Sequence, residues 1–388
     1  FPYTTLFRSR LIVEQGGELR RFSLSNPHPE VSWSALWSKV WYENYDEPKY
    51  VWQSTAANTD FEPKMSLAPL TFGTLKAAFY AMLLAAPLAA APALGVAAAL
   101  PQITLAGPPA IVSAPLIHMA ETGALKDAAQ RTVFTAWRDP DQLRMMAMGG
   151  KADVLAMPSN VAANLFNRGA GVTLLNISTW GALWIVTRDA QRKTLADFKG
   201  EEIAVPFRGD MPDIVLQLLL TKQGLDPLRD FRIRYVPTPM EAMQLLITRR
   251  VSHALLTEPA VSLAMRKTRS FPVGLIAPDL HRGADLQQEW GRMFRRTPSV
   301  PQAGIAAVGV VRSQPQVLDA VAQAYARSLA WCRDNALECG RMMARHIDLL
   351  TPEAVADAIA VSLMDAVPAA AARAELEFFF GQLMTRTP

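Results

Sequence analysis

From residue 101 onward, short apolar runs alternate with longer stretches in which apolar residues recur at helical spacing. This alternation is typical of buried strands followed by amphipathic helices. It predicts strands at 102–107, 132–138, 152–158, 231–237, 252–259 and 301–311, a turn and strand within 195–207, and two extended runs within 172–188 around a break at 178–181. It predicts helices at 113–128, 139–150, 159–169, 209–225, 239–251 and 260–267, with helices filling the remainder after 311.

Strands that lead directly into helices indicate α/β units with parallel strands. In such sheets ligands bind beyond the carboxyl ends of the strands, and helix N-termini favour anionic or strongly polar ligands. Ordinary capping or turn chemistry explains any single junction better than a ligand site does, so it is the recurrence of four junctions that predicts a cleft. The candidate ligand-binding residues are Ser113 and Ala114; Ser159 and Asn160; Gly209, Asp210 and Met211; and Thr257 and Glu258.

The first hundred residues follow a different pattern. Trp33, Trp37 and Trp41 are spaced by four, which predicts that their rings share one helical face. That helix either packs on another element or lies at a membrane interface. Residues 77–100 carry no charged side chain, and the apolar helix expected over 74–100 is either a membrane span of about 20 residues or the apolar region of a secretion signal.

Composition excludes several classes of function. The net charge of +4 comes from Arg and Lys scattered along the chain, so it does not indicate a nucleic-acid-binding protein. The five His lack metal-ligand spacing, and no Gly-x-Ser-x-Gly, HExxH or Walker A motif occurs. We therefore expect no catalytic residue, no cofactor and no metal.

The two cysteines, Cys332 and Cys339, leave two alternatives open. In one straight helix their separation corresponds to about 10 Å of rise, which is too far for a disulfide. If Asp334 and Asn335 break the helix, the two can pair in an oxidising compartment.

Four blocks of the chain carry a resemblance to a known family. They are ADVLAMPSNVAANLFNRG, TLADFKGEEIAVPFRGDMPDIVLQLLLTKQGLDP, HALLTEPAVSLAMRK and PQAGIAAVGVV. Over about 101–330, and with helices of the expected kind to 388, the chain resembles periplasmic substrate-binding proteins of nitrate, sulfonate, taurine and pyrimidine-precursor ABC importers.

This resemblance implies an α/β, two-lobed, type II periplasmic-binding-protein-like fold with hinge crossovers, preceded by the apolar helix. Lobe one is expected at 101–187 and 305–388 and lobe two at 188–304, with crossovers near 186–189 and 303–308. The resemblance assigns Ser159, Asn160 and Trp180 to the ligand site of lobe one, and Gly209, Asp210, Met211 and Glu258 to that of lobe two.

The N-terminal hundred residues resemble something else. Residues 10–90, with a polar, aromatic segment at 10–73, are similar to the entry of the first core helix of a phosphate-type ABC permease. Residues 1–9, FPYTTLFRS, can be encoded by a sequence resembling a sequencing-library adapter. These resemblances imply a chimera in which two reading frames are joined around 82–89.

The function implied is that of the solute-binding component of an ABC importer. It would capture a small anionic or polar organic solute (sulfonate-, nitrate- or pyrimidine-like) in the interlobe cleft and deliver it to a membrane permease. Trp137, Trp180 and Trp184 could supply an aromatic wall or belong to the core. We expect a monomer, periplasmic or tethered on the outer side of the inner membrane, with no nucleic-acid partner.

Two other functions are weighed against this one. Pyrimidine-precursor synthases of thiamine synthesis resemble the same fold but are enzymes, with a cysteine-rich cluster and a nucleophilic His. Here both cysteines lie in the C-terminal helical region, and His118 and His253 match that pattern weakly. A truncated permease is supported by residues 10–90 alone, since no further spans follow.

Overall fold

The computed structural model describes residues 10–23, 32–42, 45–53, 64–89, 99–276 and 280–384. The chain divides into two compact units, Phe1–Val96 and Ala97–Pro388.

The smaller unit contains short elements and one longer helix. They are β1 (Arg10–Gln15), β2 (Glu18–Ser23), α1 (Trp33–Trp37), β3 (Trp52–Gln53), β4 (Lys64–Met65) and α2 (Ala68–Ala89). The prediction that Trp41 shares a helical face with Trp33 and Trp37 is wrong. Ser38 is already extended, and Val40 bridges Lys49, so the helix ends before Trp41.

The apolar helix expected over 74–100 begins earlier, and the structure describes it as α2 over Ala68–Ala89. Residues 90–98, the end of the expected segment, lie outside the described residues. Within the described part of the chain, no helix combines the length and apolar character needed to cross a membrane.

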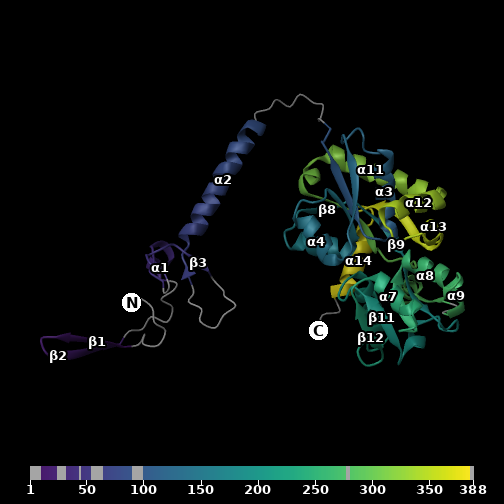
Figure 1. Cartoon of the computed structure of the whole chain (residues 1–388), viewed down its shortest axis with the longest axis horizontal. Coiled ribbons are helices and arrows are strands. Elements are labelled where there is room, and N and C mark those ends of the chain that lie inside the picture. The colour runs from purple at the N-terminus through teal and green to yellow at the C-terminus, as the bar shows by residue number, and fades with distance from the viewer. Residues whose placement is uncertain are drawn as a thin grey trace. The chain divides into compact units, whose positions relative to one another are not determined.

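The larger unit alternates strands and helices as the sequence predicts (Figure 1). Its strands are β5 (Ile103–Gly107), β6 (Thr132–Ala136), β7 (Val154–Pro158), β8 (Val172–Leu174), β9 (Asn176–Gly181), β10 (Leu183–Thr187), β11 (Glu202–Pro206), β12 (Arg232–Val236), β13 (His253–Thr257), β14 (His281–Asp285), β15 (Ala303–Val308) and β16 (Leu363–Pro368). Its helices are η2 (Ile111–Ser113), α3 (Ala114–Thr122), α4 (Pro140–Met148), α5 (Ser159–Asn167), η3 (Leu195–Phe198), α6 (Met211–Lys222), α7 (Pro239–Ile247), α8 (Ala260–Arg269), α9 (Val273–Ile276), α10 (Leu286–Phe294), η4 (Gly309–Ser313), α11 (Pro315–Asp334), α12 (Ala336–His346), α13 (Pro352–Val361) and α14 (Arg373–Met384).

Two sheets define two lobes. The first has the order β16-β9-β15-β7-β5-β6, with β8 also pairing β15, and the second has the order β12-β11-β13-β10-β14. In Figure 1 the blue and yellow ends of the unit form one lobe and its teal and green middle forms the other. The fold is therefore the α/β, two-lobed fold that the sequence predicts.

The two sheets repeat one scheme. In each, three parallel strands take the same relative order, β6-β5-β7 and β12-β11-β13. A strand arriving from the other lobe then pairs antiparallel with the third of them: β15 with β7, and β10 with β13. Parallel pairing is thus confirmed for the strand–helix units, whereas the strands exchanged between the lobes run antiparallel.

The chain crosses between the lobes in two adjacent segments. The first crossing falls at Ala182, where β9 ends and β10 begins in the other sheet. It lies earlier than the 186–189 expected, because β10 pairs along its length with lobe-two strands. The second crossing, just before β15, lies beside the first: Val300 N donates to Trp180 O (2.7 Å) and Gln302 N to Thr179 O (3.0 Å).

Close approach at this crossing requires a glycine. A Cβ added at Gly304 would lie 1.8 Å from Asn176 O, because β9 and β15 cross tightly there. The break expected at 178–181 is wrong, since β9 runs through these residues and ends at Gly181.

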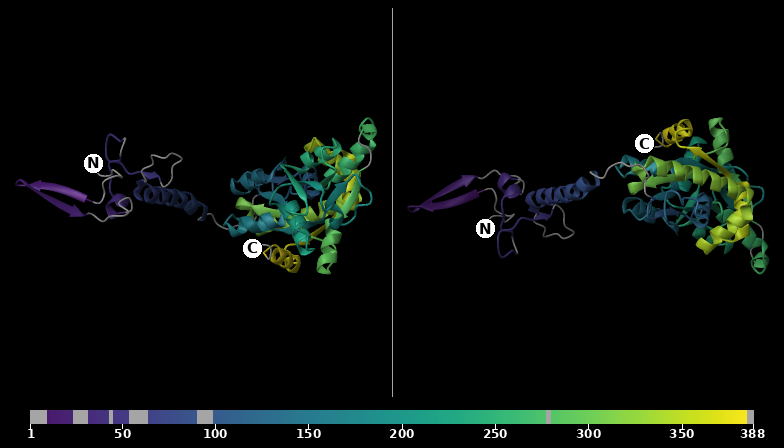
Figure 2. Two further views of the ribbon diagram at one scale, coloured as in Figure 1. Left: turned by 90° about the horizontal axis from the view of Figure 1, so that it is seen from below. Right: turned by 90° about the horizontal axis from the view of Figure 1, so that it is seen from above.

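The C-terminal helix α14 contacts the cores of both lobes. Its Leu376 packs with Ile177 of β9, while its Phe379 is fully buried in the lobe-two core with Trp290. Figure 2 shows α14 at the periphery of the unit. The whole segment 305–388 was expected in lobe one; α14 instead spans the junction, and β16 is a strand where only helices were expected.

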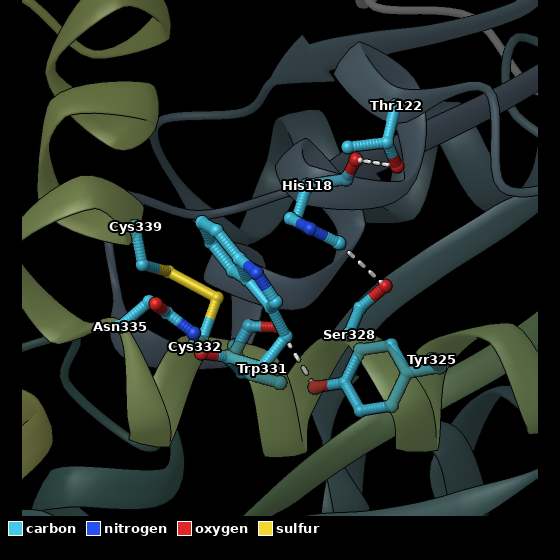
Figure 3. Close-up of a disulfide and its surroundings, with 9 residues drawn as sticks. His118, Thr122, Tyr325, Ser328, Trp331, Cys332, Asn335 and Cys339 are labelled. Carbon is cyan, nitrogen blue, oxygen red and sulfur yellow. Dashed lines mark hydrogen bonds between the residues drawn. A yellow bond between two sulfur atoms is a disulfide. The ribbon is translucent and has the colours of Figure 1, made fainter.

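The cysteines pair. Asn335 separates α11 from α12, which brings Cys332 and Cys339 to a Cα–Cα distance of 5.2 Å and joins them in a disulfide. Figure 3 shows the disulfide next to Trp331, whose ring stacks on His118. Of the two alternatives left open by the sequence, the broken helix is the one observed.

Candidate functional site

The first lobe-one junction is engaged in local structure. Ser113 is fully buried, and its hydroxyl donates to Pro108 O at 2.6 Å. Ala114, which begins α3, is also buried. Both residues lie at the sheet edge where β5 and β7 end side by side, but the Ser113 side chain already has a partner.

The second junction lies at the lobe crossing. Ser159 and Asn160 begin α5 directly after β7. The Ser159 hydroxyl donates to Pro301 O, and its backbone N–H donates to Gln302 O. The Asn160 Oδ1 atom is buried and has no hydrogen-bond partner among the described residues.

Two further residues with unpartnered buried polar atoms lie in the backbone segments next to the start of α5. Ala303 pairs with both Pro158 and Thr179, so Gln302, one residue earlier, lies next to Thr179 and to the start of α5. Thr179 is 3% exposed and Gln302 7% exposed, yet Thr179 Oγ1 and Gln302 Oε1 have no partner in the part of the chain that the structure describes. We call Asn160, Thr179 and Gln302 the hinge cluster.

An unpartnered buried polar atom costs about 1–3 kcal/mol, so three at one place are unusual. The two amide oxygens accept hydrogen bonds, and the Thr179 hydroxyl both donates and accepts. The N–H groups of α5 that follow Ser159 lie at the same crossing, and the N-terminus of a helix favours negative charge. The hinge cluster is therefore suited to a polar solute that offers donors to the amide oxygens and charge or an acceptor to the helix.

Trp180 lies on the other side of its strand. Successive side chains of a strand point to opposite faces, so Thr179 and Trp180 diverge. The Trp180 indole packs against the cluster that contains Leu376 of α14 and donates to Asp365 O at 2.9 Å. The structure thus places Trp180 against β16 and α14 and places Thr179 in the hinge cluster. Thr179 is a residue that sequence reasoning missed.

The first lobe-two junction is bridged to lobe one. Asp210, mostly buried before α6, accepts two hydrogen bonds from the Arg144 guanidinium of α4, at 3.0 and 3.3 Å. Burial raises the pKa of Asp210, and Arg144 opposes that shift. Gly209 donates its N–H to Asp213, and the Met211 side chain is buried in the lobe-two core.

At the second lobe-two junction the carboxylate has internal partners, although the Nε atom of its partner Arg282 is buried without one. The Glu258 carboxylate is completely buried and accepts from Ser262 N, from the Ser262 hydroxyl and from Arg282. Burial raises the pKa of Glu258, and the Arg282 and Ser262 hydrogen bonds oppose that shift. Thr257 ends β13 opposite Leu183. Glu258 thus caps α8 and closes an ion pair, which leaves it less available to a solute.

The other expected aromatic residues are in the core. Trp137 is buried and donates to Ala156 O, and Trp184 is buried beneath the Arg282 guanidinium.

The residues weighed for an enzyme have structural partners. His118 stacks on Trp331 and hydrogen-bonds Ser328, and buried His253 contacts Thr187. Among the described residues, no group of three or more His, Cys, Asp or Glu is arranged to hold a metal.

Neither protein-family models nor curated proteins match the chain. Solved structures do. An ABC transporter protein from Parabacteroides distasonis aligns with a TM-score of 0.59 at 20% identity, covering 74% of this chain and 94% of that one. The chain has the two-lobed fold of periplasmic binding proteins.

Two further structures carry more specific descriptions. The periplasmic nitrate-binding protein NrtA from Synechocystis aligns with a TM-score of 0.59 at 14% identity, covering 74% of this chain and 81% of that one. The alkanesulfonate-binding protein SsuA from Xanthomonas axonopodis, bound to MOPS, aligns with a TM-score of 0.53 at 17% identity, covering 75% and 96%. At these identities the likeness shows the fold alone.

Proposed function

We propose that this chain is the solute-binding component of an ABC importer, acting by binding without chemistry. The observation that carries the proposal is the hinge cluster: buried polar atoms without partners at the crossing of two lobes. Rotation about such a crossing opens and closes the lobes, and a ligand that binds the closed form better shifts the population towards it.

The hinge cluster favours one class of solute. Asn160 Oδ1 and Gln302 Oε1 require N–H or O–H donors, and the start of α5 favours an anionic or strongly polar group. We therefore propose a small anionic or polar organic solute that carries at least one donor. The neighbours described as binding nitrate and alkanesulfonate support an anionic solute, whereas the requirement for a donor rests on the hinge cluster alone.

The proposed partner, oligomeric state and location follow from the role of a solute-binding component. The closed form would deliver the solute to a membrane permease, and the chain would act as a monomer, periplasmic or tethered on the outer side of the inner membrane. The resemblance of residues 10–90 to a permease stays a prediction and carries none of this proposal.

A thermal-shift screen of the full chain tests the function. The panel contains alkanesulfonates, taurine, nitrate, bicarbonate and aminopyrimidines, with neutral alcohols as matched controls. We expect at least one anionic or donor-bearing solute to raise Tm in a concentration-dependent way, since a ligand of the native state stabilises it. Absence of any stabilisation, together with turnover of a pyrimidine precursor, would overturn the proposal.

A further inference from the structure

A pocket lies on lobe one. It has a volume of about 540 Å³, within the range of small-molecule sites, and lies among α4, α5 and the segment around η4. None of the hinge-cluster residues lines it. It is therefore a different place from the proposed solute site.

Three arginines line this pocket, and no acidic residue does. Arg144 is held in place by Asp141 and Asp210, at 3.1 and 3.0 Å. Arg168 and Arg312 form no ion pair with any carboxylate in the described part of the chain. Like charges gathered around one pocket produce a positive potential that attracts an anion.

The backbone makes room for one of these guanidinium groups. Gly171, at the pocket wall, has no side chain, and a Cβ added there would lie 2.8 Å from Arg312 Nη1. The Arg312 guanidinium therefore lies directly over the Gly171 backbone.

The rest of the lining is largely apolar. Val161 and Leu165 of α5 are buried core residues, and Ala147 and Met148 come from α4. Guanidinium groups bind two oxygens of one oxyanion in a fork geometry, and apolar walls favour an alkyl body. The pocket thus combines the two features that an amphiphilic oxyanion requires.

We propose that this arginine pocket, defined by Arg144, Arg168 and Arg312, binds a small alkyl phosphate or similar organic oxyanion. The oxyanion contacts the guanidinium groups of Arg168 and Arg312, since Arg144 is engaged by Asp141 and Asp210, and the alkyl group packs on Val161 and Leu165. The site is separate from the hinge cluster, so both can be occupied at once.

Isothermal titration calorimetry of the full chain with butyl phosphate tests this proposal. Butanol, which lacks the phosphate, and inorganic phosphate, which lacks the alkyl group, serve as controls. We expect butyl phosphate to bind more tightly than inorganic phosphate, and butanol not to bind. The Arg168→Gln/Arg312→Gln variant should bind butyl phosphate at least about tenfold more weakly, because two charge-assisted contacts are lost.

A matched control removes the same charge elsewhere. Arg327 and Arg333 are exposed on α11 and do not line the pocket. The Arg327→Gln/Arg333→Gln variant should retain wild-type affinity, as should Thr179→Val in the hinge cluster. If both double variants bound butyl phosphate equally weakly, the loss of affinity would be explained by net charge alone, and the proposal would be overturned. Loss of butyl phosphate binding in Thr179→Val would do so too, by placing the ligand at the hinge.

A lipid headgroup carries the same phosphate chemistry. Flotation with phosphatidylcholine vesicles, with and without phosphatidic acid, separates the two sources. Binding to the acidic vesicles without binding of butyl phosphate would overturn the assignment to a small solute.

Discussion

The hinge cluster and the lobe-two junctions are both polar, and both were candidates for ligand binding. At the lobe-two junctions the carboxylates have partners: Asp210 is paired with Arg144, and Glu258 with Ser262 and Arg282. At the hinge, Asn160, Thr179 and Gln302 each keep a buried polar atom without one. The lobe-two carboxylates and the hinge-cluster atoms thus differ in whether the protein itself supplies their hydrogen-bond partners.

The difference separates residues that stabilise the fold from residues that await a solute. A carboxylate with internal partners contributes to folding, and its loss leaves those partners unsatisfied. A polar atom without a partner lowers stability until a ligand supplies one. The comparison therefore predicts opposite effects of mutation on stability and on affinity at the two places.

Glu258→Ala should give the largest loss of stability. It removes a fully buried carboxylate with three hydrogen bonds and leaves Arg282 unpaired, which we expect to cost about 3 kcal/mol of unfolding free energy. Urea denaturation measures it. Glu258→Gln, which keeps a hydrogen-bonding oxygen, serves as the milder control. Wild-type stability with abolished solute binding would instead make Glu258 a ligand residue.

Removal of the disulfide should give the next largest effect. The Cys332→Ser/Cys339→Ser variant opens a short loop and should lose about 2.5 kcal/mol. Solute affinity should not change, because the disulfide lies between α11 and α12 and includes no hinge-cluster residue. Denaturation and calorimetry of the same preparation check both. A parallel fall in solute affinity would mean that a loss of stability alone weakens binding. Affinity would then no longer distinguish the hinge cluster from the residues that stabilise the fold.

Asp210 should give the smallest effect, seen as a dependence on pH. Its folded-state pKa is raised, so the native state binds the proton more tightly than the unfolded state does. The free energy of unfolding of the wild type, relative to that of Asp210→Asn, should therefore fall as pH rises from the ordinary pKa of Asp to the raised pKa of Asp210. Above the raised pKa this difference should no longer change with pH. Urea midpoints across acidic pH measure this difference. A rise in relative stability over that range would show that Arg144 outweighs burial.

Local patterns were sufficient to predict most of the fold. Apolar runs ending at Ser159 or Asp210 predicted the strand–helix units, because burial and capping act over a few neighbouring residues. The strand β14, with the sequence HRGAD, has no apolar run, so periodicity could not predict it. The placement of α14 across both lobes depends on Phe379 meeting Trp290, a contact between residues far apart in the sequence.

The candidate site was predicted only in part. Ser159 and Asn160 lie where the sequence places them, at the start of a helix after a strand. Thr179 and Gln302 were missed because their proximity arises from two crossings that are distant in the sequence. One signal was available: within an extended strand, Thr179 must face opposite to Trp180. Choosing between the two faces required the contact of Trp180 with Asp365 of β16, which is distant in the sequence.

Calorimetry of Thr179→Val and Gln302→Leu, with the solute that raises Tm most in the screen, tests the hinge cluster most directly. Each substitution replaces an unpartnered polar atom by an apolar group of similar shape, so the ligand-free protein should be as stable as the wild type or more so. Solute affinity should fall at least about tenfold in each variant, since a buried hydrogen bond to the solute is lost. Unchanged affinity in both variants would contradict the assignment of the hinge cluster as the solute site.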